Sequence, residues 1–247
     1  MSVKKQRLDQ ILFNRNLAES KTKAQAIIMA GQVFVDGKNI NKSGFNINSN
    51  AAIEIKNLGP KWVSRGATKL LTALEKNKII VRDKICIDLG SSTGGFTDVL
   101  IQNGANKVYA VDVGTNQLHE KLKKNNKVIS LEKTNARYLK KDQFEELIDV
   151  MVCDVSFISL KKVIEPNLHL LKDKSVIIAL IKPQFESKKN ETKKGVVKDS
   201  TIHQRICNEI TEWFKTIGYT KILSIIESPI KGPKGNTEFL ITVKYQK

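Results

Sequence analysis

The chain has 247 residues, 40% of them hydrophobic and 27% charged, which fits one large globular domain or a mid-sized domain with a small companion. Its 42 Lys and Arg against 25 Asp and Glu give a net charge of +17, which favours nucleic acid or an anionic membrane as partner, unless a lysine-rich proteome raises every surface charge. No apolar run is long enough to span a bilayer, and the N-terminus shows no apolar signal core. The three cysteines are far apart and have no zinc-binding spacing. Free cysteines fit a reducing compartment, so we expect a cytoplasmic protein.

The first 55 residues predict two short helices and a hairpin. RLDQILFNRNLAES places Leu8, Ile11 and Leu12 at helical spacing. A second helix follows in SKTKAQAIIMAG, with Ser20 as its N-cap and Gly31 as its C-terminal stop. QVFVDGKNI then alternates polar and apolar residues around an Asp–Gly turn, which is a hairpin signal.

Beyond Gly59-Pro60 the pattern changes to alternating strands and helices. Four segments, KICIDLG, KVYAVDVG, DVMVCDVSF and SVIIALIKPQF, have near-continuous apolar runs that suit a parallel sheet buried on both faces. KILSIIESPI and NTEFLITVKY follow, and we expect them to form an antiparallel hairpin at one edge. We therefore predict a small N-terminal domain over residues 1–59, a linker over 60–66 and a doubly wound α/β domain over 67–247.

Basic residues are concentrated in the N-terminal part, where the first 65 residues hold 11 basic and 4 acidic side chains. Lys21 and Lys23 lie in the first turn of the second helix, where cations oppose the helix dipole. Because a helix N-terminus attracts anions, lysines placed there make sense if a phosphate docks. Arg7, Arg15 and Lys42 could extend the same surface. The alternative is that these cations form an ordinary solvated face that binds no phosphate.

The motifs RLDQIL, ES-K-x-x-A and II-x-AGQVFVDGK, within residues 5–55, resemble the S-four RNA-binding domain. That fold is named for a ribosomal protein and also occurs in pseudouridine synthases and a tRNA synthetase. Lys21 stands where such domains often carry Arg. The resemblance implies a structured RNA ligand, and the cations expected to contact it are Arg7, Arg15, Lys21, Lys23, Lys42 and Arg65.

IDLGSSTGGFTDVL runs from a strand through a glycine loop into a helix. The loop reads GxxxGG rather than the GxGxxG of dinucleotide sites, which disfavours NAD as ligand. A plain βα turn that binds no ligand is the alternative. The next strand ends on Asp112, which can accept hydrogen bonds from both ribose hydroxyls of a nucleoside. A nucleoside without a pyrophosphate indicates S-adenosylmethionine. The residues expected to contact it are Gly90, Ser91, Ser92, Thr93, Gly94, Gly95, Asp112, Val113, Asn135, Ala136 and Asp154.

Two of the buried strands end in charges of opposite sign, Asp154 after VMVC and Lys182 after VIIALI. Ligands of doubly wound sheets bind outside the carboxyl ends of strands, so neighbouring strands would place both charges in one cleft; an inert salt bridge at the rim is the alternative. Many amine methyltransferases carry Asn/Asp-Pro-Pro-Tyr/Phe here, whereas DVSF has no proline, which favours an oxygen or carbon acceptor. Lys69, early on a helix in WVSRGATKLLTAL, is the candidate for a second cation that helps a lysine base lose its proton.

SRGATKL, DLGSSTGGFTDVL, VYAVDVG, TNAR, DVSFISL, KPQFE, KGVVKD and SPIKGPKGNTEFL occur in that order, and together they resemble the TlyA family of rRNA 2′-O-methyltransferases, also described as hemolysins. The resemblance spans essentially the whole chain. It implies a Rossmann-like, S-adenosylmethionine-dependent methyltransferase sheet with helices on both faces, plus a small α+β RNA-binding domain. It also implies ribosomal RNA or ribosomal subunits as partner, cytidine 2′-hydroxyls of 23S or 16S rRNA as targets, and no stable membrane association.

The catalytic domain of that family resembles the FtsJ-type ribose methyltransferases, which use a Lys-Asp-Lys-Glu tetrad. The tetrad falls on Lys69, Asp154, Lys182 and Glu238, so all four residue types are present. Ala67 departs from the family, which usually has a second glycine at that position.

Three other functions stay open from the sequence. One is a membrane-active hemolysin, although the chain shows no clear basic amphipathic lytic helix. Another is an RNA-binding protein whose methyltransferase fold is inactive, against which the intact tetrad and glycine loop argue. The third is methylation of tRNA or mRNA in place of rRNA.

Overall fold

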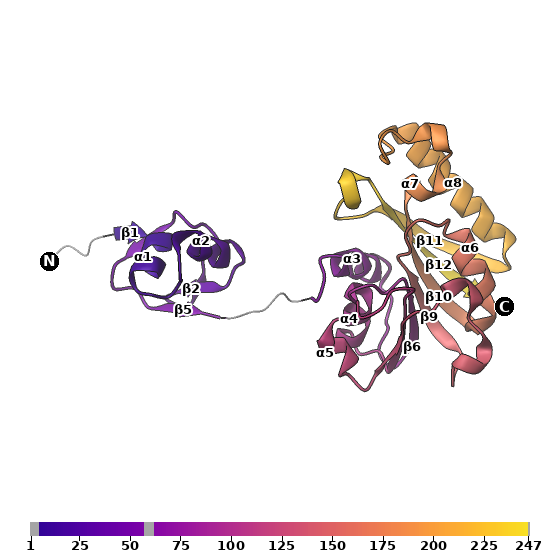
Figure 1. Ribbon diagram of the computed structural model, residues 1–247, viewed down its shortest axis with the longest axis horizontal. Coiled ribbons are helices and arrows are strands. Elements are labelled where there is room, and N and C mark those ends of the chain that lie inside the picture. Colours follow the sequence, from indigo (N-terminus) through magenta and orange to yellow (C-terminus); the bar gives the residue numbers. More distant parts are fainter. Residues whose placement is uncertain (1–4, 57–61, 247) are drawn as a thin grey trace. The chain divides into compact units, whose positions relative to one another are not determined.

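The computed structural model describes residues 5–56 and 62–246, which fall in two compact units, Met1–Lys61 and Trp62–Lys247 (Figure 1). Each unit has a hydrophobic core of its own. Of the predicted linker 60–66, residues 60 and 61 lie outside the described residues, and residues 62–66 lie in the second unit. There the backbone N–H of Val63 donates a hydrogen bond of 2.9 Å to the carboxylate of Asp98.

The first unit contains two helices and five short strands. Its elements are β1 (Lys5–Arg7), α1 (Leu8–Asn14), α2 (Lys21–Met29), β2 (Val33–Val35), β3 (Lys38–Asn39), β4 (Asn46–Asn48) and β5 (Ile53–Ile55). As predicted, Ser20 caps α2, its side chain accepting a hydrogen bond of 3.1 Å from the N–H of Lys23. The predicted hairpin is β2–β3, and Asp36 and Gly37 both turn with positive φ, as its two-residue loop requires.

The second unit is built on a seven-stranded sheet with the order β11-β12-β10-β9-β6-β7-β8. Its helices and strands are α3 (Ala67–Asn77), β6 (Ile85–Leu89), α4 (Gly95–Gln102), β7 (Lys107–Val111), α5 (Glu120–Lys123), β8 (Val128–Leu131), β9 (Ile148–Cys153), α6 (Lys161–Ile164), β10 (Leu171–Ile181), α7 (Pro183–Glu186), α8 (Ser200–Thr216), β11 (Tyr219–Glu227) and β12 (Phe239–Gln246). Short 3-10 turns occur at Ala136–Tyr138, Lys141–Gln143, Glu165–Leu170, Lys189–Glu191 and Pro233–Gly235.

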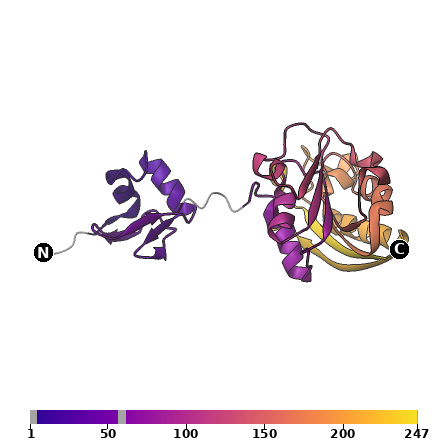
Figure 2. The same cartoon turned by 90° about the horizontal axis from the view of Figure 1, so that it is seen from below.

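The predicted doubly wound sheet is confirmed, because the five strands from β10 to β8 are parallel and helices cover both faces (Figure 2). Alternate residues of each central strand enter opposite cores. Ile87 of β6 packs with α6 and α8, whereas Cys86 packs with α3 and α4. The predicted edge hairpin is also confirmed: β11 and β12 pair antiparallel, and β12 pairs antiparallel with β10.

Among the residues that the structure describes, no helix combines the length and apolar character needed to cross a membrane.

Candidate active site

The sheet topology brings Asp154 and Lys182 together. Their strands, β9 and β10, are parallel neighbours with Cys153 opposite Ala179, so both strands deliver the residues that follow them to the same edge. Lys182 Nζ lies 2.6 Å from Asp154 Oδ1. The two opposite charges therefore meet at the carboxyl end of the sheet, where ligands of doubly wound folds bind.

Lys69 and Glu238 extend this pair into a row of four alternating charges. Lys69, in the first turn of α3, places its Nζ 2.7 Å from Glu238 Oε2 and 3.7 Å from Asp154 Oδ2. Lys69 and Lys182 are each 7% exposed and Glu238 is 0% exposed, so water screens these charges little. Removing Lys69 would leave Glu238 buried without a counter-charge, whereas Asp154 has a lysine on each side.

Two residues that we did not predict orient the row. Ser156 Oγ accepts a hydrogen bond of 2.9 Å from Lys182 Nζ, and Gln184 Nε2 donates one of 3.0 Å to Glu238 Oε1. Ser156 follows Asp154 by two residues and Gln184 follows Lys182 by two. They lie in the motifs DVSF and KPQF, respectively. The sequence carries no signal for which polar side chains in these motifs would form hydrogen bonds with the tetrad.

The four tetrad residues line one cavity of about 230 Å³. The glycine loop and the loop before β12 complete its wall. Gly232 of the latter loop allows a close approach: a Cβ there would lie 2.1 Å from Glu238 Oε1. The remaining residues around this tetrad cavity are Ser64, Arg65, Gly66, Asp88, Gly90, Ser91, Ser92, Thr93, Gly95, Phe96, Ser156, Ile230, Lys231, Gly232 and Pro233.

A second cavity of about 470 Å³ opens beside the first and shares Gly90, Ser92, Asp154 and Ser156 with it. It is lined mainly by the segments that follow β7, β8 and β9, and we call it the nucleoside cavity. Its other lining residues are Val111, Asp112, Val113, Gln117, Thr134, Asn135, Ala136, Arg137, Val155, Phe157, Ile158 and Val163. The expected cofactor residues thus line one cavity or both, except Gly94.

Gly94 lines neither cavity, although it belongs to the glycine loop. Its φ is +93°, and a Cβ there would lie 2.3 Å from a methyl of Leu122 and 2.7 Å from one of Leu118. Both leucines are buried. Packing against Leu118 and Leu122 therefore requires a residue without a side chain at this position.

Gly90 lies where the two cavities meet. Its φ is +83°, and a Cβ there would lie 3.0 Å from the backbone oxygen of Asp154. A side chain at this position would be strained in conformation and would press on the strand end that carries the tetrad aspartate. The glycine therefore lets the loop after β6 lie directly against the end of β9.

Asp112 fixes the glycine loop through its carboxylate. Oδ2 accepts a hydrogen bond of 2.8 Å from the N–H of Ser92, and Oδ1 accepts one of 2.7 Å from the N–H of Gly114. A carboxylate has about four lone-pair sites, so about two stay available, and Asp112 lines the nucleoside cavity.

Asp88, which we did not predict as a site residue, has a buried carboxylate with one free oxygen. Oδ2 accepts hydrogen bonds from the N–H and the hydroxyl of Thr97, at 2.9 and 2.7 Å. Oδ1 has no hydrogen-bond partner in the described parts of the chain, and Asp88 lines the tetrad cavity. Burial raises the pKa of Asp88 to about 7, helped by the charges of Asp154 and Asp112 and opposed by Thr97.

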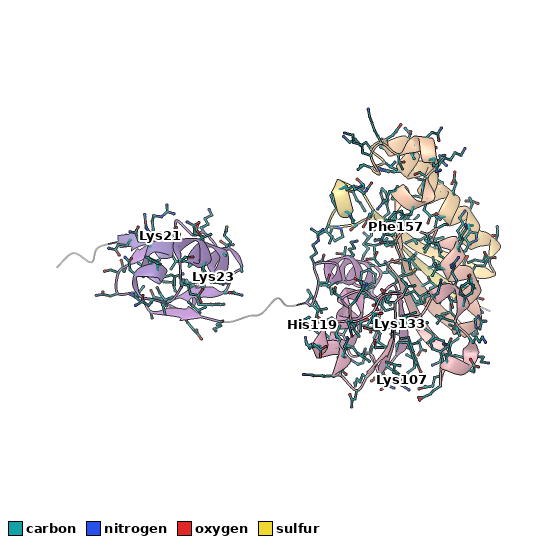
Figure 3. All side chains as sticks on the ribbon, viewed as in Figure 1. Lys21, Lys23, Lys107, His119, Lys133 and Phe157 are labelled. Carbon is teal, nitrogen blue, oxygen red and sulfur yellow. The ribbon has the colours of Figure 1, made fainter. Side chains whose placement is uncertain are left out.

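The cations expected to contact RNA fall into two groups. Lys21, Lys23 and Lys42 are exposed, and no carboxylate lies within 4.0 Å of them in the described part of the chain. Figure 3 labels the first two, on the N-terminal unit. Arg7 instead forms a salt bridge of 2.7 Å with Asp9, and Arg15 donates hydrogen bonds to the carbonyl oxygens of Ser49 and Ala51. Arg65 belongs to the second unit, where it is exposed and lines the tetrad cavity.

Comparison with known proteins places both units in families. A model of the FtsJ-like methyltransferase family matches residues 62–245, and one of the S4 domain matches residues 6–53. Hemolysin A of Brachyspira hyodysenteriae is 42% identical over 237 residues, which cover 95% of this chain and 98% of that protein. The 16S/23S rRNA (cytidine-2′-O)-methyltransferase TlyA of Mycobacterium tuberculosis is 37% identical over 242 residues, covering 97% of this chain and 90% of that one.

The fold also resembles that of a solved structure over the full length of this chain. A provisionally named hemolysin from Streptococcus thermophilus is 38% identical, with a TM-score of 0.74, covering 100% of this chain and 90% of its own.

Proposed function

The chain belongs to the TlyA family of FtsJ-like methyltransferases, and from that premise we propose that it methylates ribose 2′-hydroxyls of ribosomal RNA with S-adenosylmethionine as methyl donor. The observation that carries the proposal is the row Glu238–Lys69–Asp154–Lys182, which lines the tetrad cavity and reaches the adjoining nucleoside cavity at Asp154. One cavity is lined by the expected nucleoside contacts and the other by the row itself. Lys69 and Lys182 line the tetrad cavity, which a ribose hydroxyl could enter.

The residues present fit S-adenosylmethionine at both of its ends. Asp112 has lone pairs left for ribose hydroxyls on the nucleoside side, with Asn135 and Ala136 lining the same cavity. On the methionine side, the free Oδ1 of Asp88 is a buried acceptor to which an ammonium group can donate. When bound, this cofactor supplies a methyl group already activated by its positive sulfur.

The row has a distinct task for each member. Lys182, held by Asp154 Oδ1 and Ser156 Oγ, polarises the 2′-hydroxyl as negative charge develops on its oxygen, and in its neutral form takes the proton. Lys69 adds positive potential from the other side of Asp154, and Glu238 with Gln184 holds Lys69 in place. Most of the rate enhancement would come from aligning the oxygen for in-line attack.

The TlyA relative from Mycobacterium tuberculosis is named for cytidines of 16S and 23S rRNA, and we propose cytidine as the target here. Exposed lysines of the S4 domain would hold the RNA through its phosphates. Ribosomal subunits would then be the partner and the cytoplasm the place of action.

Primer extension on ribosomal RNA tests the proposed function. After incubation of unmodified subunits with the protein and S-adenosylmethionine, reverse transcriptase should stop beside the new mark at low nucleotide concentration and read through at high concentration. Stops that persist at both concentrations would indicate methylation of a base and would contradict a ribose acceptor.

Cofactor binding is expected to release protons near pH 7 because of Asp88. With a pKa of about 7, roughly half of this carboxyl is protonated at that pH, and an ammonium group at Oδ1 would favour the carboxylate. We expect release of about half a proton, measured by titration calorimetry in buffers of different ionisation enthalpy. Binding heats that do not depend on the buffer would contradict the contact, and Asp88→Asn, which cannot titrate, should remove the buffer dependence.

The same carboxyl affects stability without cofactor. Its pKa lies above the ordinary value of 3.8, so between that pH and about 7 the folded state binds more protons than the unfolded state. The free energy of unfolding should therefore fall as pH rises through this range. Asp88→Asn should flatten that part of the profile in thermal melts.

A further inference from the structure

Four lysines from two separate segments line a third cavity of about 570 Å³. Lys193, Lys194 and Lys198 come from the turn before α8, and Lys234 comes from the loop before β12. The other lining residues are Val196, Val197, Gly235 and Thr237, so the wall holds no acidic side chain. We call this cavity the lysine pocket.

The charges of the lysine pocket are not neutralised by the protein. All four lysines are exposed, and within the described ranges none has a carboxylate at ion-pair distance. Lys231, three residues from Lys234, differs in this respect because it pairs with Glu227 at 2.8 Å. Four like charges around one hollow repel one another and favour a bound anion.

The two segments are held together by one buried side chain, Asn236, which is 3% exposed. Its Oδ1 accepts a hydrogen bond of 3.2 Å from the N–H of Val197, and its Nδ2 donates one of 3.0 Å to the carbonyl oxygen of Gly195. Lys193 and Val196 also form a β-bridge. The backbone that carries the lysines is thus held in place, and little ordering of the backbone is needed when a ligand binds.

The lysine pocket lies across a single loop from the tetrad. Lys231, Gly232 and Pro233 line the tetrad cavity, whereas Lys234 and Gly235 of the same loop line the lysine pocket. Glu238, three residues further along the chain, is itself a member of the tetrad row. A nucleotide whose ribose enters the tetrad cavity therefore brings its neighbouring phosphates close to this loop.

We propose that the lysine pocket binds backbone phosphates of the RNA strand beside the target ribose. This inference rests on the proposed function and adds a docking surface within the catalytic unit to the one expected on the S4 domain. Phosphate contacts position a strand without reading its sequence. The lysine pocket would thus fix which ribose along the strand reaches Lys182, while the S4 domain supplies affinity for the surrounding RNA.

The test compares two full-length triple variants that remove the same charge. One carries Lys193→Gln, Lys194→Gln and Lys234→Gln. The control carries Lys174→Gln, Lys221→Gln and Lys244→Gln, which line a cavity at the opposite end of the sheet. Binding of a ribosomal RNA fragment is measured as a function of salt, and unchanged S-adenosylmethionine affinity shows that each variant is folded.

The logarithm of the RNA-binding constant falls linearly with the logarithm of salt concentration. We expect the lysine-pocket variant to make this negative slope shallower by about two, since each lost phosphate contact removes roughly 0.7–0.9 from its magnitude. The control should change it much less, and methyl transfer should show a raised KM for RNA with a smaller change in kcat. Equal changes in both variants, or no change in either, would overturn the proposal. Weaker binding to ribosomal subunits but not to naked RNA would also overturn it, because the partner would then be an acidic protein. These slopes are measured without methyl transfer, so they decide the matter even if the wild-type protein proves inactive.

Discussion

Lys182→Ala is expected to lower methyl transfer by about a thousandfold, within the range that positioned acid–base groups contribute, while S-adenosylmethionine binds nearly as in the wild type. Lys182 Nζ is the cation held between Asp154 Oδ1 and Ser156 Oγ at the cavity wall. The substitution does not leave Asp154 without a counter-charge, because Lys69 Nζ lies 3.7 Å from its other oxygen. The fold should therefore survive, and single-turnover methyl transfer with calorimetric cofactor binding separates the two effects.

Lys172→Ala is the matched control. Lys172 lies on the same strand, β10, and its Nζ is 3.0 Å from Asp149 of the same neighbouring strand, β9, but at the opposite end of the sheet. It is a partly exposed ion pair of the kind that contributes little to stability. Its variant should keep wild-type activity within about twofold. Normal turnover by Lys182→Ala would sink the assignment of Lys182 as the acid–base group.

A fragment of residues 60–247 should bind S-adenosylmethionine as the full chain does but methylate ribosomal subunits at least about tenfold less efficiently. All residues that line the tetrad and nucleoside cavities fall between Ser64 and Glu238, within the second unit. The exposed cations Lys21, Lys23 and Lys42 are lost with the first unit, and with them the phosphate contacts that hold the RNA. The loss should appear in KM for RNA and should grow with salt concentration.

In the full chain, Lys21→Glu combined with Lys23→Glu should reproduce part of this loss without removing a domain. Neither lysine has an ion-pair partner in the part of the chain that the structure covers, and both are exposed, so the fold should tolerate the change. Full activity of the 60–247 fragment on ribosomal subunits would contradict a docking role for the first unit.

The sequence predicts best those site residues that directly follow the ends of strands. Near-continuous apolar runs identify parallel strands, and a charge directly after such a run must lie at the ligand-binding edge of the sheet. Asp154 and Lys182 followed from that rule alone. Asp112 followed in the same way from the end of β7, and it now proves to clamp the glycine loop as well.

Lys69 and Glu238 could not be paired from the sequence by local reasoning. They lie 169 positions apart, in the first turn of α3 and directly before β12, and only the resemblance to a known tetrad joined them. Ser156, Gln184 and Asp88 were missed because each depends on which buried polar atom finds a partner, which is decided by tertiary packing. The clash that a side chain at Gly94 would make with Leu118 and Leu122 was likewise invisible in the sequence, because it depends on tertiary packing.

Mass spectrometry of ribosomal RNA nucleosides tests most directly whether the tetrad methylates ribose. RNA from subunits treated with S-adenosylmethionine and wild-type protein should contain additional 2′-O-methylcytidine, and RNA treated with Lys182→Ala should contain none above background. A methyl group on a base, or the same amount of 2′-O-methylcytidine with both proteins, would contradict ribose methylation by this row of charges.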